Sequence, residues 1–282
     1  MLKAFHNFAP QPLMFSWGLI RIYWYGFFIV LGFLAAFAVL KFLAKKHKIN
    51  LDDLVSLVFY LFIFGLLGVR IYDVFLEWEY YLKYPLNVFK VWEGGMAIHG
   101  AIIAGFFTTY FFVKKGKFRD LKSSFFDNFF QILALLACVM PLGQAIGRFG
   151  NYFNQELFGR PTNLPWGIFI SPEKRPIEYL NESFFHPTFL YESLGNLFIF
   201  ILLFSLQLYF LKKNKVSFKS NFLISALYLI LYSILRFSLE FIRIDFTPNV
   251  LSWRFPQLIS LLIILLTIGS AIIFKRKNKF NT

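Results

Sequence analysis

Residues 125–159 are FFDNFFQILALLACVMPLGQAI followed directly by GRFGNYFNQELFG. The first part, 125–146, is apolar and about as long as a membrane-spanning helix, which needs about 20 such residues. The second part, 147–159, places an arginine, two asparagines, a glutamine and a glutamate at the end of that helix. Polar groups at such a position are costly to desolvate and usually mark a substrate site. This stretch therefore predicts a membrane protein and indicates where its chemistry takes place.

The composition of the whole chain agrees with that prediction. Hydrophobic residues make up 58% and charged residues only 16%, against about 25% charged residues in soluble domains. The apolar residues occur in long runs, so we expect an all-α integral membrane protein that is a single catalytic domain over residues 1–282. The seven expected transmembrane helices cover residues 17–40, 54–76, 97–113, 125–147, 189–211, 221–242 and 256–274.

The basic residues predict how the helices are oriented. Seventeen lysines and arginines gather in the segments 41–48, 114–122, 212–219 and 275–279, which follow every second helix, whereas eight lie on the opposite side. The positive-inside rule then places the C-terminus in the cytoplasm and the N-terminus outside. The net charge of +14 is explained by this distribution, and we expect no nucleic-acid partner. The first apolar run lacks the features of a cleaved signal peptide and is expected to remain as a helix.

Two of the expected external loops are long. They are residues 77–96, which are rich in aromatics, and residues 148–188, which contain five prolines. The prolines predict a small external cap with little regular helix between the fourth and fifth helices.

Several arginines in or near the apolar runs need partners. Tyr232, Arg236 and Glu240 are spaced i, i+4, i+8, which places them on one face of a helix. Two interpretations are open. An Arg236–Glu240 pair holds helices together, or a polar face that includes Arg148 lines a cavity for an anion. Guanidinium groups suit phosphate because their planar fork of donors stays charged.

Other residues limit the chemistry. His99 follows a Gly94-Gly95 pair near the start of the third helix and is either structural or a proton acceptor near neutral pH. Cys138, the only cysteine, lies inside an apolar run and is expected to be a buried hydrophobe. The sequence contains no phosphate-binding Gly-rich loop ending in Lys-Ser/Thr and no Gly-x-Ser-x-Gly, which disfavours ATP use and serine hydrolysis.

The block from Gly147 to Glu156, with Gly159, resembles the signature of the prolipoprotein diacylglyceryl transferase family. That signature is Gly-Arg-x-Gly/Ala-Asn-aromatic-x-Asn-x-Glu, then two residues and a glycine, and every fixed position matches. Ala101 replaces the usual second glycine of the family's His-Gly-Gly pattern. Motifs that match in chain order are Trp24-Tyr25-Gly26, Gly68-Val69-Arg70, His99-Gly100 with Gly105, His186-Pro187 through Tyr191-Glu192, and Tyr232, Arg236 and Glu240.

The resemblance implies a reaction at a bacterial cytoplasmic (inner) membrane. A diacylglyceryl group moves from phosphatidylglycerol, a membrane lipid, to the thiol of the lipobox cysteine in the signal sequence of a preprolipoprotein, and glycerol 1-phosphate is released. It implies no metal and no cofactor. The catalytic residues that it suggests are His99, Arg148 and Arg236. The substrate-binding residues that it suggests are Tyr25, Arg70, Asn151, Asn154, Glu156, Gly159, Tyr232 and Glu240.

Two other functions are compatible with the residues alone. A transporter of a phosphorylated or anionic solute would also need an arginine-lined cavity, although the sequence has no repeated halves or paired broken helices. A non-catalytic membrane scaffold would leave the polar block at residues 147–159 unexplained.

Overall fold

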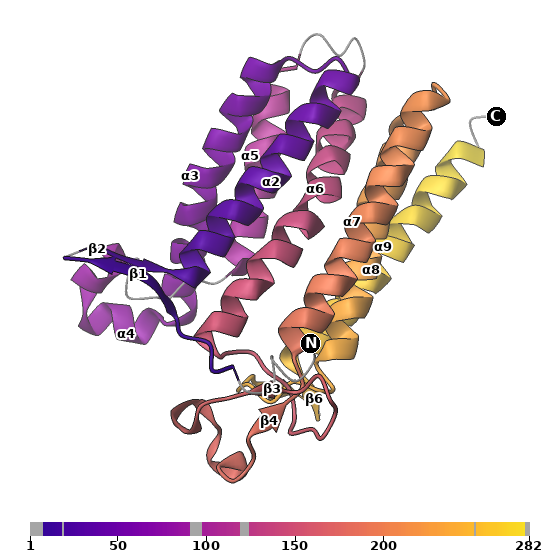
Figure 1. Cartoon of the computed structure of the whole chain (residues 1–282). Coiled ribbons are helices and arrows are strands. Elements are labelled where there is room, and N and C mark those ends of the chain that lie inside the picture. Colours follow the sequence, from indigo (N-terminus) through magenta and orange to yellow (C-terminus); the bar gives the residue numbers. More distant parts are fainter. Residues whose placement is uncertain (1–7, 19, 91–97, 119–123, 251, 280–282) are drawn as a thin grey trace. The chain divides into compact units, whose positions relative to one another are not determined.

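The computed structural model describes residues 8–18, 20–90, 98–118, 124–250 and 252–279, without the side chains of residues 98, 99 and 276–279. It is mostly helical, at 71%. Among the described residues six helices are long and apolar enough to cross a membrane, and a seventh apolar helix, α5, is shorter. The six are α2 (Trp24–Lys46), α3 (Leu51–Leu76), α6 (Phe125–Asn154), α7 (Thr188–Lys212), α8 (Phe218–Leu239) and α9 (Phe255–Lys279), and α5 covers Ile98–Lys114 (Figure 1). The chain is therefore a multi-pass membrane protein.

The chain forms two compact units. The first comprises Met1–Leu40, Leu136–Lys215 and Phe222–Thr282, and the second comprises Lys41–Leu135 and Val216–Asn221. The first unit contains the polar block, the helix α7, and nearly all of α8 and α9.

The first helix begins later than the sequence predicts, at Trp24 rather than at residue 17. The residues before it form an antiparallel hairpin of β1 (Leu13–Trp17) and β2 (Ile20–Tyr23). Gly18 takes a φ of +58° in the turn, a conformation that glycine adopts without a steric penalty. All nine strand residues are exposed. Because most of them are apolar, their composition resembles that of a spanning helix, and the sequence prediction joined those from Trp17 onward to α2.

The fourth helix ends later than predicted, at Asn154 rather than at residue 147. Arg148 and Asn151 therefore belong to the last turns of α6 and not to the loop 148–188. The N-terminal part of α2 packs on this part of α6 through a ring stack, in which the Trp24 and Phe153 centroids are 4.6 Å apart. Further along α2, a Cβ atom on Gly32 would lie 2.8 Å from the Gly143 carbonyl oxygen, so the two helices cross closely.

The segment between α6 and α7 has little regular helix, as its prolines predict. It contains a two-stranded sheet of β3 (Ile168–Phe169) and β4 (Phe184–Phe185) and the short 3-10 turns η3 (Pro172–Lys174) and η4 (Ile177–Tyr179). Its own small core holds Ile168, Ile170 and Phe185 together with residues at the ends of α6 and α7. The segment is thus fixed to the same helix ends that carry the polar block.

In the second unit, α3 and α5 pack so closely that their backbones touch. A Cβ atom on Gly68 would lie 2.5 Å from the Gly100 carbonyl oxygen and 2.6 Å from Ala104 Cβ. Small residues at such a crossing let membrane helices approach without a hydrophobic driving force. The segment after α3, predicted as a loop, contains α4 (Trp78–Lys83) and η1 (Pro85–Phe89).

After α8 the chain turns through a small hairpin into the last helix. The hairpin pairs β5 (Asn249–Val250) with β6 (Trp253–Arg254), and α9 starts at the next residue. Figure 1 shows α7, α8 and α9 side by side within the first unit. This connection brings Arg254 back to the end of α8.

Candidate active site

Arg148 lies where α6 meets α7, and its two terminal nitrogens are both engaged. Nη2 donates to Glu192 Oε1 at 2.7 Å, and Nη1 donates to Asn151 Oδ1 at 3.1 Å. The Glu192 side chain is 2% exposed and the Arg148 side chain 23%, so the carboxylate is buried and the arginine is half-buried. A pair of this kind fixes the direction of the guanidinium group.

Arg236 approaches the same carboxylate from α8. Its Nη1 atom lies 3.8 Å from Glu192 Oε2, and its Nη2 atom lies 2.6 Å from Glu240 Oε1. Nη1 is buried and has no hydrogen-bond partner among the residues that the structure describes. The predicted Arg236–Glu240 pair is therefore present, and within the described ranges the Nη1 atom of Arg236 remains an unpaired donor near Glu192.

Two further arginines complete the cluster. Arg243 Nη1 lies 3.7 Å from Glu192 Oε2 and its Nε donates to Asp245 at 2.8 Å. Arg254 Nε lies 2.7 Å from Glu240 Oε2, whose side chain is 0% exposed. We call these seven residues the arginine cluster: Arg148, Glu192, Arg236, Glu240, Arg243, Asp245 and Arg254. Four guanidinium groups thus share three carboxylates, and the two buried glutamates are each contacted by three arginines.

The end of α6 folds back so that Glu156 meets the helix that precedes it. The Glu156 amide donates to Asn151 O and the Gln155 amide donates to Tyr152 O, both at 3.0 Å, which is a Schellman motif. Glu156 Oε1 then accepts from Asn151 Nδ2 at 2.7 Å and from Asn154 Nδ2 at 3.3 Å. A chain of side chains therefore runs from Glu156 through Asn151 to Arg148.

Gln155 makes this fold-back possible although it is not a glycine. Its φ is 51°, a left-handed conformation that costs a residue with a Cβ about 1–2 kcal/mol. Its side chain offsets the cost, because Nε2 donates to Pro10 O at 2.8 Å and Oε1 accepts from the Ser171 amide at 2.6 Å. Both contacts tie the end of α6 to neighbouring segments of the first unit.

Two glycines of the block serve close packing. A Cβ atom on Gly150 would lie 2.8 Å from Tyr25 Cδ2, so this glycine lets Tyr25 lie directly against α6. A Cβ atom on Gly159 would lie 2.7 Å from Ile242 Cγ2 and 2.9 Å from His186 Cβ. The Gly159 amide also donates to His186 O at 2.9 Å. Gly159 thus holds the chain after the block against the segments before α7 and after α8.

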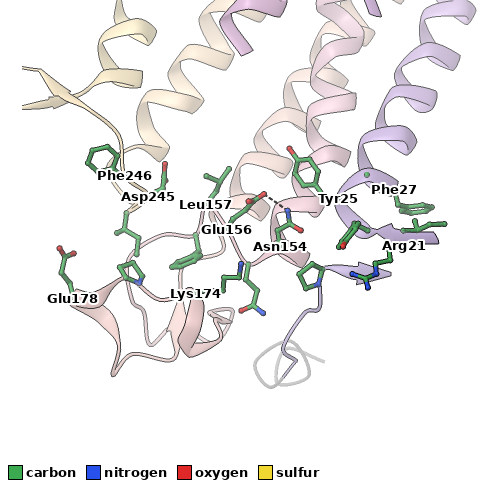
Figure 2. Close-up of a pocket in the computed structure, with 18 residues that line it drawn as sticks. Arg21, Tyr25, Phe27, Asn154, Glu156, Leu157, Lys174, Glu178, Asp245 and Phe246 are labelled. Atoms are coloured by element: carbon green, nitrogen blue, oxygen red, sulfur yellow. Dashed lines mark hydrogen bonds between the residues drawn. The ribbon is translucent and has the colours of Figure 1, made fainter. Parts of the chain in front are cut away.

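An open cavity of about 1190 Å³ lies beside the block. Figure 2 shows Tyr25 near the start of α2 and Asn154 and Glu156 at the end of α6 among its lining residues. The lining also includes Arg21, Lys174 and Asp245. Three of the sequence-predicted residues therefore face a common space, and Asp245 links its wall to the arginine cluster.

Two predicted site residues belong to the second unit. Arg70, which is 7% exposed, donates through Nε to Val88 O at 2.8 Å and through Nη2 to Asn87 O and Lys90 O. Its guanidinium also lies over the Tyr81 ring. Arg70 therefore holds the η1 segment on α3. His99 is in the first turn of α5, and its side chain lies outside the described residues.

The sequence prediction missed part of the arginine cluster. Glu192 stood in a matching motif, but nothing in the sequence showed that it is the carboxylate between Arg148 and Arg236. Arg243 and Arg254 lie between α8 and α9, outside every motif that the sequence analysis identifies. Their ion-pair partners are distant in sequence, so only the folded chain shows that these residues belong to the cluster.

Comparisons with known proteins agree with the geometry. The family model described as prolipoprotein diacylglyceryl transferase matches residues 12–273. Proteins named phosphatidylglycerol–prolipoprotein diacylglyceryl transferase are similar to this chain in several bacteria. The protein from Fervidobacterium nodosum is 39% identical, covering 93% of this chain and 83% of the relative. The protein from Thermotoga maritima is 41% identical, covering 90% of this chain and 81% of the relative. The protein from Synechocystis sp. is 38% identical over 92% and 87%.

These relatives cover 90–93% of this chain, and the residues matched by the family model, 12–273, include the block at residues 147–159 and every member of the arginine cluster. None of the relatives is named as a transporter, so the transporter alternative has no support. A match of this extent, on a chain whose signature residues meet in one buried cluster, identifies the lineage: the chain belongs to the prolipoprotein diacylglyceryl transferase family.

Proposed function

We propose that this protein transfers the diacylglyceryl group of phosphatidylglycerol to the cysteine thiol of a prolipoprotein signal sequence that carries a lipobox. The reaction forms a bond between the cysteine sulfur and carbon 3 of the diacylated glycerol. The bond between that carbon and the phosphate oxygen breaks, glycerol 1-phosphate leaves, and the thiol proton is released. The relatives' printed names supply the donor lipid and the protein acceptor.

The single observation that carries the proposal is the free donor of Arg236. Arg236 Nη1 is buried, 3.8 Å from Glu192, and without a hydrogen-bond partner in the described part of the chain. A buried guanidinium donor of this kind lacks an acceptor, and a phosphate oxygen supplies one. Arg148, held in place by Glu192 and Asn151, contributes the second positive charge.

The arginine cluster also suits the chemical step. The leaving group carries its negative charge away from carbon, and preorganised positive charge stabilises that charge as it develops. Because the carboxylates already hold the guanidinium groups, little reorganisation is needed during the reaction. The four arginines of the cluster outnumber its three carboxylates, which favours an anionic ligand.

The nucleophile comes from the substrate. Cys138, the only cysteine, is buried in the middle of α6 and is not placed for attack. A thiol must lose its proton to attack efficiently, and we propose His99 as the group that receives it. We further propose that Tyr25, Asn151, Asn154, Glu156, Gly159, Tyr232, Glu240 and Arg70 shape the binding site for the lipid headgroup.

The proposed topology follows from the basic residues. We propose seven spans, with α5 as the shortest, in the bacterial cytoplasmic (inner) membrane. The N-terminus and the cap at residues 155–187 then face outward, and the C-terminus faces the cytoplasm. This orientation suits a substrate whose signal sequence has just crossed the membrane, while the donor lipid reaches the site from the bilayer.

The test is a transfer assay with the purified protein in detergent. The substrates are phosphatidylglycerol and a peptide with a lipobox cysteine, and mass spectrometry follows the thioether product. Arg148→Lys keeps the charge but loses the fork that contacts both Glu192 and Asn151, so we expect kcat/KM to fall about a hundredfold or more. Lys212→Ala, at an exposed position in the last turn of α7, is the matched control. Wild-type protein without transfer activity, or a fully active Arg148→Lys variant, contradicts the proposal.

A further inference from the structure

A second group of polar side chains lies closer to the middle of the spans than the arginine cluster, and the proposed chemistry does not use it. Gln144 stands one turn before Arg148 on α6, Asn196 one turn after Glu192 on α7, and Tyr228 two turns before Arg236 on α8. Four residues of α-helix correspond to about 6 Å along the axis. All three positions are therefore displaced in the same direction, away from the helix ends that carry the cluster.

The three helices meet at this level. Ser193 Oγ donates to Ala145 O at 2.8 Å, which joins α7 to α6. A Cβ atom on Gly195 would lie 2.6 Å from Leu235 Cδ1, which joins α7 to α8. Gln144 Nε2 donates to the Tyr228 hydroxyl at 3.1 Å, which joins α6 to α8. These contacts bring α6, α7 and α8 together along the stretch that carries Gln144, Asn196 and Tyr228.

Two amides of this second group lack partners. Asn196 is 0% exposed, and neither its Nδ2 nor its Oδ1 atom has a hydrogen-bond partner among the described residues. Gln144 Oε1 is buried and equally without one. An unsatisfied buried polar group costs about 1–3 kcal/mol, and in a bilayer no bulk water compensates for it. Groups in this condition are explained when a ligand completes their hydrogen bonds.

We propose that Gln144, Asn196 and Tyr228 form a subsite for the two ester carbonyls of the diacylglyceryl group, an assignment that rests on the proposed function. In a glycerophospholipid the ester groups lie a few bonds from the phosphate, on the side of the acyl chains. A phosphate at Arg148 and Arg236 therefore brings the esters to the polar residues one to two turns deeper.

The chemistry of the second group matches ester oxygens, which only accept hydrogen bonds. Asn196 supplies a free NH2 group. Rotation of the Gln144 amide lets its oxygen accept from the Tyr228 hydroxyl and turns its own NH2 group toward the ligand. Two amide donors then face two carbonyl acceptors. The subsite would hold the part of the lipid that is transferred, whereas the arginine cluster holds the part that leaves.

The experiment compares two donor lipids with the same chain length. One is diester phosphatidylglycerol and the other is its dialkyl ether analogue, which lacks both carbonyls. In the peptide transfer assay we expect the wild-type protein to use the diester with a KM about tenfold lower, as two lost hydrogen bonds of ordinary strength would give. In the Gln144→Met, Asn196→Leu double variant that preference should fall to about onefold, through poorer use of the diester.

The ratio between the two lipids is measured within each variant, so a change in the amount of folded protein cancels. Thr267→Val on α9 is the matched control, because it removes a buried polar group that bonds only to its own helix, at Ile263 O; it should keep the full preference. In lipid-free detergent, Asn196→Leu should raise the unfolding temperature, since it removes an unsatisfied amide. A wild-type protein that uses both lipids equally, or a double variant that keeps the preference, overturns the subsite. A wild-type protein that uses neither lipid overturns the proposed function instead.

Discussion

Glu192 Oε1 lies 2.7 Å from Arg148 Nη2, although the Glu192 side chain is only 2% exposed. The second oxygen of the same carboxylate faces Arg236 at 3.8 Å and Arg243 at 3.7 Å. One carboxylate of α7 therefore sets the positions of arginines from α6, α8 and the segment after α8. A buried carboxylate with three cationic neighbours is difficult to replace, because each arginine would lose its counter-charge in a medium that solvates charge poorly.

Replacement of Glu192 should therefore reduce both stability and activity. We expect Glu192→Ala to lower the free energy of unfolding by about 3–5 kcal/mol, because it leaves buried arginines without their partner. Thermal unfolding in detergent measures the first effect and the peptide transfer assay the second. Glu173→Gln, at an exposed position in η3, should change neither. An unfolding temperature for Glu192→Ala equal to that of wild type would show that the carboxylate does not stabilise the cluster.

Gly68 and Gly65 should respond differently to the same substitution. Both lie in α3, but a Cβ atom on Gly68 would lie 2.5 Å from Gly100 O, whereas a Cβ atom on Gly65 meets nothing within 4 Å. We expect Gly68→Ala to push α3 and α5 apart and to lower the unfolding temperature clearly. Gly65→Ala should be neutral or stabilising by up to about 1 kcal/mol, because alanine is the better helix former. The two unfolding curves give the comparison, and equal effects would mean that the crossing is not close.

The wild-type protein with Gln155 should be more stable to unfolding than either the Gln155→Gly or the Gln155→Ala variant. Gln155→Gly removes the left-handed strain but also the contacts to Pro10 O and the Ser171 amide. Gln155→Ala loses the contacts and keeps the strain, so it should be less stable than Gln155→Gly by about 1–2 kcal/mol. Unfolding of the three proteins under one condition tests the order. An alanine variant as stable as the glycine variant would contradict the Schellman geometry at this position.

The titration of His186 should make the stability of the protein depend on pH. Partial burial beside the segment 159–160 lowers the pKa of His186 below its ordinary value of 6.5, and its Nδ1 atom lies 3.1 Å from the Tyr191 hydroxyl. The unfolded chain then binds a proton more readily than the native one, so this contribution to stability is complete above about pH 6.5 and is lost as the pH falls. His186→Gln should reduce the loss of unfolding temperature between pH 7.5 and pH 5.5. An identical pH dependence in both proteins would exclude His186 as its source.

The long apolar helices could be predicted from the sequence because length and composition alone decide them. The expected spans 54–76, 189–211 and 256–274 differ from α3, α7 and α9 by a few residues at each end. The hairpin Leu13–Tyr23 could not be predicted in this way, since apolar strand residues have the same composition as the start of an apolar helix. The extra turns of α6 also escaped prediction, because tertiary contacts of Arg148 and Asn151 support a helix that composition alone would end.

The candidate site was predictable where a motif is local. Arg148, Asn151 and Glu156 lie within nine residues and interact directly in the folded chain. Arg236 and Glu240 form an ion pair, as their spacing indicates, although Glu240 is the first residue after α8. What joins the two groups is Glu192, far from both along the chain, and no spacing rule gives such a contact. Arg254 approaches Glu240 only because the hairpin of β5 and β6 reverses the chain.

The arginine cluster has a consequence for how the protein is made. Its members are spread from residue 148 to residue 254, so during synthesis Arg148 enters the bilayer ahead of α7, which carries its carboxylate partner. Glu192 can pair with Arg148 only when α7 arrives, and Glu240 gains its last counter-ion, Arg254, only when β6 follows. A nascent chain that stops before β6 thus carries incompletely paired ions, so quality control has a physical basis for distinguishing unfinished chains from complete ones.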